Sequence, residues 1–410
     1  MANTIITPSI IAKEGLMQLK NSLHMSNQVH REYKEEFKKV GDTISIRKPV
    51  KFYTADGATR VNQDVEEKST NVTIDERKHV SWKFSTQDLT LSIEQYSERY
   101  IKPAMITLAN SMDRSGHALY SKVFNAVGTP GTTPASFGQV SPVAQRLDEM
   151  AVPMDSRSLV MNPAAHYAIA GDQVGLQAWD GKMKSAYEQA MIGRIANFQA
   201  LSSQNVTNHT TGTHGGTPLV NGGSQNVTYE NAAGANTQSL VTDGWNNSEA
   251  VLKAGDVFTI AGVFAVNPVP GNGAAAKTVM PYLQQFTVIS DATSDGSGNA
   301  TLTISPAIIT TGPQQTVDAA PADNAAITLM GSASTAYPQN LGFHRNAFAL
   351  VTCPLEMPDG AAFKAQESAD GLSVRVVKDY DIDTDEDVIR LDILYGWDAI
   401  YPELACRLWG

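Results

Sequence analysis

The stretch from Ser92 to Val127, SIEQYSERYIKPAMITLANSMDRSGHALYSKVFNAV, decides how the rest of this chain is organised. Its apolar residues recur mostly at four-residue spacing, which predicts one face of an amphipathic helix. This stripe consists of Tyr96, Tyr100, Ala104, Leu108, Met112, Leu119 and Val123. Pro103 predicts a bend or a fresh start, and Gly128 and Pro130 predict the end of the helix. At ~1.5 Å per residue it would run to roughly 50 Å, so we expect a strut.

Composition limits the classes of protein to which the chain can belong. Its 410 residues suggest two or three domains, and its hydrophobic fraction of 42% suffices for real cores. We expect no membrane span and no secretion signal, because no apolar run reaches ~20 residues and no basic region precedes one. Cys353 and Cys406 are far apart and are expected to be buried and reduced. The formal net charge of -11 argues against wrapping nucleic acid, although not against enclosing it.

The first 40 residues form an arm whose helix is predicted to start at Thr7-Pro8. The arm has too few apolar positions for its own core, so it either packs on something else or is a loosely docked terminus. A long β-hairpin is predicted next, because apolar and polar residues alternate over 44–52 and again over 72–84. Such a two-stranded ribbon is marginal in water, so we expect a neighbouring subunit to supply the surface on which it lies. The charged residues of its polar tip, over 53–70, are candidate intersubunit contacts: Arg60, Asp64, Glu66, Glu67 and Lys68.

The remainder predicts an α+β domain with an insertion. Helices are expected from Ser141-Pro142 to Met150, over 163–170 and over 182–191, with a strand over 159–161 and a strand pair from Ile195. From about Ser203 the composition shifts to Asn, Thr, Gly, Ser and Ala, and short strands are predicted over 257–260, 285–289, 300–304 and 326–329. Regular short strands of this kind favour a small all-β sandwich or barrel. Strong strand patterns return over 347–351, 373–377 and 388–394, so the β-module is an insertion into one domain.

We find no motif for catalysis, a cofactor or a metal. The nucleophile-elbow, phosphate-loop and paired-histidine zinc patterns do not occur in the sequence. His209 and His214 are the closest pair of histidines, but their Thr/Gly loop is unsuited to holding a metal rigidly.

The segment 379–387 comes closest to a calcium loop. Its candidate ligands are Asp381, Asp383, Asp385 and Asp392. Glu386 replaces the required glycine, and the flanking residues alternate as strands do. An acidic hairpin tip is therefore the favoured interpretation, and micromolar calcium binding would overturn it.

The order of arm, long hairpin, strut helix, α+β domain and closing strands resembles the major capsid proteins of tailed double-stranded DNA phages, which have the Hong Kong 97-like fold. The inserted β-module makes the chain similar, more specifically, to short-tailed phage coat proteins that carry an extra β-barrel. The residues that carry this resemblance are Leu108-Ala109-Asn110, residues 252–263 (LKAGDVFTIAGV), residues 394–399 (LYGWDA) and Tyr401-Pro402.

The resemblance implies a set of domains and a function. The implied parts are an N-terminal arm (1–40), an extended loop (41–91), the spine helix of a peripheral domain (92–136), an axial domain (137–202 and 338–372), an inserted β-barrel (203–337) and closing strands (373–410). The implied function is non-catalytic self-assembly, through pentamers and hexamers, into an icosahedral virion capsid built in the host cytoplasm. A scaffolding protein and a portal are the implied assembly partners, and the shell encloses DNA without sequence-specific binding.

Two other classes of protein were weighed. A secreted or surface-bound bacterial adhesive protein would use the Asn/Thr-rich β-module for recognition, but it would need an export route. A hydrolase is the least favoured, because no nucleophile and base can be named.

Overall fold

The computed structural model describes residues 8–31, 43–52, 54–55, 57–62, 68–85, 97–174, 188–228, 236–269, 277–361, 363–369, 371–384 and 386–410. The chain divides into two compact units. The first unit comprises Met1–Ser45, Asn71–His117 and Phe348–Asp398, and the second comprises Ile46–Thr70, Ala118–Ala347 and Ala399–Gly410. Within the described ranges, no helix is long and apolar enough to cross a membrane.

The sheet of the first unit is organised around the 14-residue strand β20 (Glu386–Ala399). It pairs antiparallel with β19 (Leu372–Asp381), which pairs in turn with β18 (Phe363–Ala369). Strand β3 (Glu76–Ser85) pairs antiparallel with β20 over its whole length, and β17 (Phe348–Thr352) also pairs with β20. The strands predicted near 347–351, 373–377 and 388–394 are therefore confirmed.

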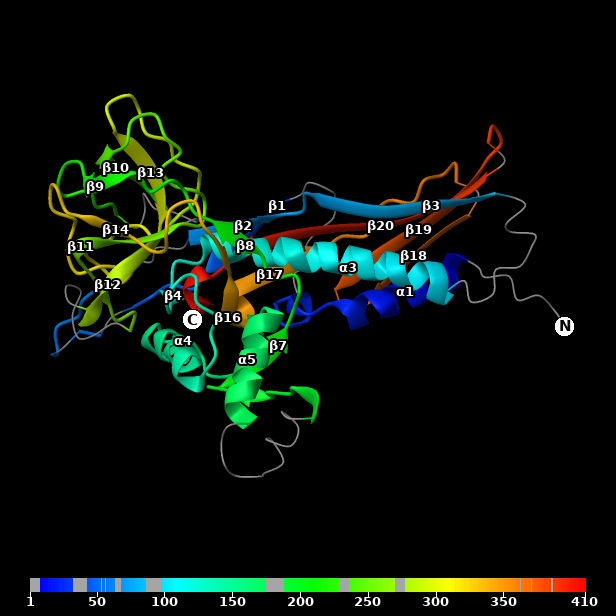
Figure 1. The fold of residues 1–410 in the computed structure, drawn as a ribbon, viewed down its shortest axis with the longest axis horizontal. Coiled ribbons are helices and arrows are strands. Elements are labelled where there is room, and N and C mark those ends of the chain that lie inside the picture. The colour runs from blue at the N-terminus through cyan, green and yellow to red at the C-terminus, as the bar shows by residue number, and fades with distance from the viewer. Residues whose placement is uncertain are drawn as a thin grey trace. The chain divides into compact units, whose positions relative to one another are not determined.

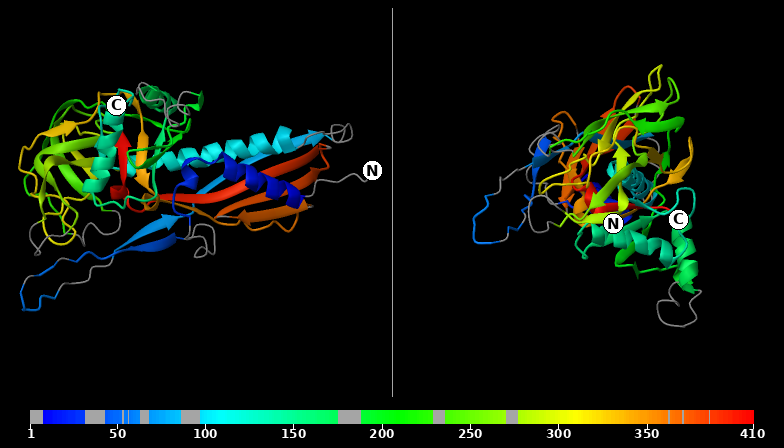
Figure 2. Two further views of the ribbon diagram at one scale, coloured as in Figure 1. Left: turned by 90° about the horizontal axis from the view of Figure 1, so that it is seen from below. Right: turned by 90° about the vertical axis from the view of Figure 1, so that its left-hand side faces the viewer.

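Two helices lie along this sheet, as Figures 1 and 2 show. Helix α1 (Pro8–Ser22) begins where Thr7-Pro8 predicts, and it contacts β18, β19 and α3 (Lys102–His117). The buried Asp113 of α3 accepts hydrogen bonds from the backbone N–H groups of His24 (2.7 Å) and Ser26 (3.1 Å), which fixes the segment after α1. Over residues 8–31 the arm is therefore packed, while residues 32–40 lie outside the described part.

The strut helix starts later than its sequence pattern. A π-helical turn, η3 (Ser97–Ile101), precedes α3, so the fresh start predicted at Pro103 is confirmed. The predicted stripe is buried at Ala104, Leu108 and Met112. Residues 92–96, with which the predicted helix begins, lie outside the described part.

The prediction of one continuous helix to Val127 is wrong. Helix α3 ends at His117, a short 3-10 turn η4 (Ala118–Lys122) follows, and β4 (Ala126–Val127) is a strand. The physical reason is that β4 pairs in parallel with β21 (Ala405–Leu408), which requires extended backbone. Gly128 consequently follows a strand and caps no helix.

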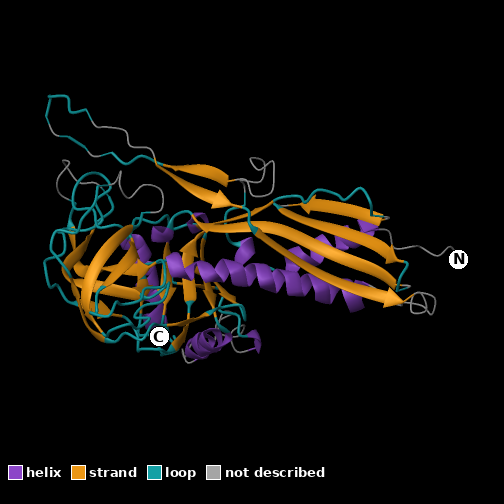
Figure 3. Cartoon of the chain, turned by 90° about the horizontal axis from the view of Figure 1, so that it is seen from above, coloured by secondary structure: helices purple, strands orange, loops and turns teal. Residues whose placement is uncertain are grey.

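The predicted hairpin is present at its base. Strands β1 (Thr43–Lys48) and β2 (Lys68–Thr73) form a two-stranded sheet, visible in Figure 3. The second arm does not continue as ribbon, because β2 ends at Thr73 and β3 joins the sheet of β20 instead. Of the tip, residues 53, 56 and 63–67 lie outside the described part.

The second unit contains a mixed sheet with the order β4-β21-β16-β5-β7-β6. Strand β16 (Asn340–His344) lies between β21 and β5 (Arg157–Met161), and β7 (Phe198–Ser202) pairs in parallel with β5. Because β16 returns to the sheet that β7 leaves, the β-module is an insertion, as predicted. The neighbouring antiparallel strand β6 (Arg194–Ile195) confirms the expected strand pair.

Helices α4 (Phe137–Glu149) and α5 (Pro163–Val174) pack on this sheet. The predicted start of α4 at Ser141-Pro142 is wrong, since Pro142 lies inside the helix and extended Ser136 precedes it. Val140 and Val143 belong to the apolar core, and their burial favours helical backbone in the turns before and around Pro142. Most of the helix predicted over 182–191 lies outside the described part.

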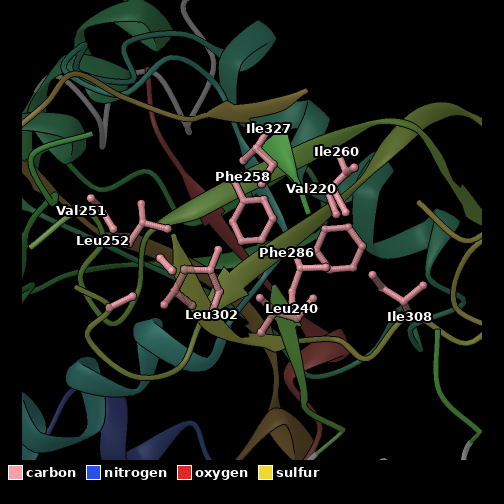
Figure 4. Packing of buried hydrophobic residues seen from close by; sticks show 14 of the residues in the cluster. Val220, Leu240, Val251, Leu252, Phe258, Ile260, Phe286, Leu302, Ile308 and Ile327 are labelled. Carbon is pink, nitrogen blue, oxygen red and sulfur yellow. The ribbon is translucent and has the colours of Figure 1, made fainter. Parts of the chain in front are cut away.

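The inserted module is a nearly closed barrel with the strand order β14-β11-β12-β13-β10-β9. Its strands are β9 (Gly216–Val220), β10 (Gln238–Trp245), β11 (Val257–Val266), β12 (Val279–Val288), β13 (Ala300–Ser305) and β14 (Ile327–Leu329). A bridge between Leu219 and Ala326 joins β9 to the segment that enters β14. Phe258 and Phe286 stack in the barrel core with ring centroids 5.7 Å apart (Figure 4). The predicted α+β class with an all-β insertion is thereby confirmed.

Candidate functional site: the neck of the inserted barrel

The chain enters and leaves the barrel through a narrow neck. Strands β8 (Asn208–Thr210) and β15 (Ala336–Pro338) pair antiparallel there, with His209 opposite Tyr337. The residues of this neck lie within the second unit.

A buried carboxylate is fixed at this neck. Asp256 is 2% exposed and directly precedes β11. It accepts hydrogen bonds from the backbone N–H groups of Lys253 (2.7 Å) and Gly212 (3.0 Å) and from Nε2 of His209 (2.8 Å). Nε2 of His214 lies 3.6 Å away. Burial alone would raise the pKa of Asp256, but these hydrogen bonds hold it well below its usual range, so the carboxylate is ionised at neutral pH.

Tyr120 and Arg407 extend this cluster toward the mixed sheet that contains β21. The Tyr120 hydroxyl lies 3.0 Å from Nδ1 of His209. The fully buried Arg407 of β21 donates from Nη1 to the Gly255 carbonyl (2.6 Å) and from Nη2 to Oγ1 of Thr287 (3.1 Å). Burial lowers the pKa of Arg407 to about 10, so it remains a cation at neutral pH. The cluster therefore contains one buried anion and one buried cation.

Gly255 allows these groups to meet. Its φ of +104° lies in the left-handed region that favours glycine. A Cβ atom at this position would lie 3.1 Å from the Tyr120 ring and 3.2 Å from the His209 ring. The Ala-Gly-Asp turn of the LKAGDVFTIAGV segment is thus required by packing at the neck.

Strand β12 is hydrogen-bonded to η4 and to β4. The buried Gln285 side chain accepts from the Ala126 N–H and donates to the Ala126 carbonyl, both at 2.8 Å. Oγ1 of Thr287 donates to the Ser121 carbonyl (3.0 Å). Around these bonds, Ala126, Val257 and Trp409 form a small apolar cluster. The barrel is therefore joined to the rest of its unit by satisfied polar contacts as well as by the two connecting strands.

The Tyr120, His209 and Asp256 chain has the connectivity of a nucleophile, a base and an orienting carboxylate. Burial raises the pKa of Tyr120, which makes its hydroxyl a poor nucleophile at neutral pH. None of the three residues lines the ≈ 490 Å³ cavity found in this unit. The geometry consequently favours a structural joint.

The two histidines singled out in the sequence do meet, since both face Asp256. Three or more His, Cys, Asp or Glu side chains able to hold a metal ion are not gathered anywhere in the described ranges. The predicted pair is thus part of a hydrogen-bonded cluster.

The predicted contact residues at the hairpin tip are not brought together by the described structure. Arg60 is exposed, whereas Asp64, Glu66 and Glu67 lie outside the described residues. Lys68 begins β2, and its side chain is likewise outside the description. Their contact function stays a prediction.

The acidic segment 379–387 is a hairpin tip, as the sequence favours. Strands β19 and β20 pair up to Asp381 and Glu386, and Asp385 lies outside the described residues. The fourth calcium candidate, Asp392, is far from the turn and fully buried. Its carboxylate pairs with Arg375 (2.6 Å) and Arg390 (2.8 Å), which assigns it to the sheet and excludes it from a calcium loop.

The sequence alone did not reveal the positions of Tyr120, Asp256 and Arg407 at the neck. Asp256 belongs to the segment 252–263 that carries the resemblance, and its hydrogen-bond partner His209 lies 47 residues before it. The sequence signal that could have indicated this cluster was the closely spaced pair His209 and His214, together with Asp256 directly before a predicted strand.

Comparison with known proteins gives three results. The family model described as "P22 coat protein - gene protein 5" matches residues 2–410. A "Major capsid protein" of Acyrthosiphon pisum secondary endosymbiont phage 1 is 24% identical over 294 residues, which are 70% of this chain and 68% of that protein.

Solved structures give the third result. The chain is similar to "Mycobacterium phage Che8", with TM-score 0.48, 12% identity, and coverage of 94% of this chain and 90% of that one. It is also similar to "Capsid of Ralstonia phage GP4", with TM-score 0.46, 9% identity, and coverage of 93% and 87%.

Proposed function

We propose roles in shell assembly for the parts of this chain, which belongs to the P22 coat protein family and is the major capsid protein of a tailed bacteriophage. It is a structural, non-enzymatic component of the virion that forms an icosahedral shell from many copies of itself. The observation that carries this conclusion is the family match across residues 2–410. The Hong Kong 97-like fold expected from the sequence agrees with this family match. The alternative of a bacterial adhesive protein is overturned by it.

The domain boundaries expected from the sequence provide the framework for these roles. The tip of the extended loop (41–91), over residues 53–70, lies on a neighbouring subunit, and Arg60, Asp64, Glu66, Glu67 and Lys68 make the contacts. Support comes from the two-stranded β1–β2 sheet, which is marginal without a covering surface. Arg60 is exposed, as a contact residue must be before assembly.

The inserted barrel stiffens its own subunit. Support comes from the neck, where Asp256 accepts from His209, Arg407 donates to the Gly255 carbonyl, and Gln285 binds both polar groups of Ala126. Buried hydrogen bonds of this kind favour one arrangement of the parts they join.

The finer assignments of partners rest on the same proposal. Subunits gather as pentamers and hexamers, and a scaffolding protein and a portal take part in assembly in the host cytoplasm. The chain encloses DNA without recognising its sequence. Its net charge of -11 supports this, because an acidic protein binds DNA phosphates weakly and therefore does not hinder the movement of DNA.

Deletion of residues 53–70 tests the role of the loop. We expect a soluble, folded subunit that no longer closes shells, because the deletion spares β3 and the sheet of β20. Circular dichroism and sedimentation velocity distinguish the two properties. Normal particles from the deletion variant would refute the proposed role of the loop.

A further inference from the structure

A cavity of ≈ 490 Å³ lies in the second unit and has no assigned function. It lies among the end of β1, one end of the barrel strands and the segment after β20, and its lining includes Lys48, Lys51, Val266, Gln315 and Leu404. Its volume falls within the ~300–1,000 Å³ that is usual for ligand sites.

The lining combines an apolar floor with an excess of positive charge. Phe124 and Val266 are each 5% exposed and contribute to the floor. Lys48 and Lys51 line the cavity, and Glu403 is the acidic residue among its lining side chains. A third lysine, Lys277, lies close by and donates to the Gln315 carbonyl (3.0 Å). Burial, and then the charge of Lys51, lower the pKa of Lys277 to about 7, which is consistent with crowded positive charge.

A ligand that fits this lining has an apolar group flanked by carboxylates. The chain itself carries such a group at the tip of the β19–β20 hairpin. Ile382 there is 82% exposed, the largest exposed fraction of any large apolar side chain in the described ranges. Asp381 and Asp383 flank it, and the Asp383 N–H binds Oδ1 of Asp381 (3.0 Å), which holds the turn in shape. Tyr380, 49% exposed, adds further apolar surface.

We propose that the β19–β20 tip of one subunit inserts Ile382 into the Lys48–Lys51 cavity of a second copy, with Asp381 and Asp383 against the two lysines. The proposal rests on the proposed shell function and deepens it by naming one contact between subunits. The argument is complementarity, because each patch supplies the charge and the apolar surface that the other lacks. Two different patches of one chain form a head-to-tail contact, which builds rings and closed assemblies.

Disulfide trapping tests this contact in assembled particles. Cys353 and Cys406 are both buried, so engineered cysteines are the reactive ones. We would co-express a subunit carrying Ile382→Cys with a subunit carrying Lys51→Cys and oxidise the particles. A covalent dimer is expected at least ten times more abundant than with the control partner Val241→Cys, which is 41% exposed on the barrel.

The outcomes separate this inference from the proposed function. Normal particles without the dimer, or with no more of it than the control gives, would overturn the proposed contact and leave the shell function intact. Failure of the unmodified chain to enter shells would instead count against the shell function.

Charge reversal provides a second test that does not need cysteines. Lys51→Glu should lower the denaturant concentration at which particles dissociate, and Asp383→Lys in the same chain should restore at least half of that loss. Unchanged dissociation in Lys51→Glu, or no recovery in the double variant, would contradict the contact.

Discussion

The indole ring of Trp397 occupies the space that a side chain at position 116 would need. A Cβ atom built on Gly116 would lie 2.7 Å from the Trp397 ring, and Nε1 of Trp397 donates to the Met112 carbonyl (3.1 Å) one helical turn earlier. Helix α3 and strand β20 are therefore in contact at the level of the helix backbone.

Gly116→Ala is expected to destabilise the first unit. Although alanine favours helix by about 1 kcal/mol, the added methyl group overpacks against the ring, at a cost of about 1–3 kcal/mol. Urea denaturation of the unassembled subunit should show a lower midpoint. Gly138→Ala in α4 is the matched control, because its Cβ atom would meet only the Ser136 Oγ at 3.7 Å. Equal midpoints for the two variants would contradict the close contact.

The stability of the first unit should depend on pH through His117. Burial, and then the charge of His24, lower the pKa of His117 from 6.5 to about 4. Both of its ring nitrogens lack hydrogen-bond partners within the described residues. The unfolded chain binds this proton more readily, so stability is full above pH 6.5 and falls as the pH drops toward 4, by about 3 kcal/mol at most.

His117→Leu should flatten this dependence, because leucine removes the titrating group and two buried nitrogens. Thermal melts between pH 7 and pH 4 measure the effect, with His24→Gln as the control for the neighbouring charge. An equally steep loss of stability in His117→Leu would show that other groups cause it.

Asp392 should contribute far more to the stability of the first unit than a carboxylate at the sheet surface does. Asp392→Asn leaves Arg375 and Arg390 without their buried partner, which typically costs about 3–5 kcal/mol. Asp387→Asn in the same strand breaks a pair with Lys378 (3.3 Å) that retains access to solvent, and should cost about 1 kcal/mol or less. Denaturation of both variants measures the difference, and similar losses would contradict the assignment of Asp392.

Gln285→Leu tests the joint at the barrel neck. It leaves the N–H and carbonyl of Ala126 without the side chain that binds both, at about 1–3 kcal/mol for each buried group. Hydrogen exchange at the Ala126 amide should become faster, and Gln285→Glu, which still accepts from that N–H, should keep part of the protection. Unchanged exchange in Gln285→Leu would show that the joint does not depend on this side chain.

Local periodicity was sufficient to predict the barrel strands β11, β12, β13 and β14 and the long strands β19 and β20, but it missed β9 and β10. It failed at the end of the strut, where Leu119 and Val123 continue the four-residue spacing and are buried, yet lie beyond the α-helix. Burial was predicted correctly there, but the backbone is determined by the pairing of β4 with β21, some 280 residues away. Periodicity carries no information about such distant pairing.

The neck was beyond the reach of sequence reasoning for the same reason. Asp256 gains its importance from His209 and from the location of Arg407 in β21, and both positions depend on the finished fold. A turn-forming aspartate and a deeply buried one look alike in sequence.

Cryo-electron microscopy of the virion tests the central claim most directly. The account predicts an icosahedral shell built of this chain, in which the loop over residues 53–70 of each copy lies on a neighbouring copy. A shell in which that loop folds back on its own subunit would contradict the account.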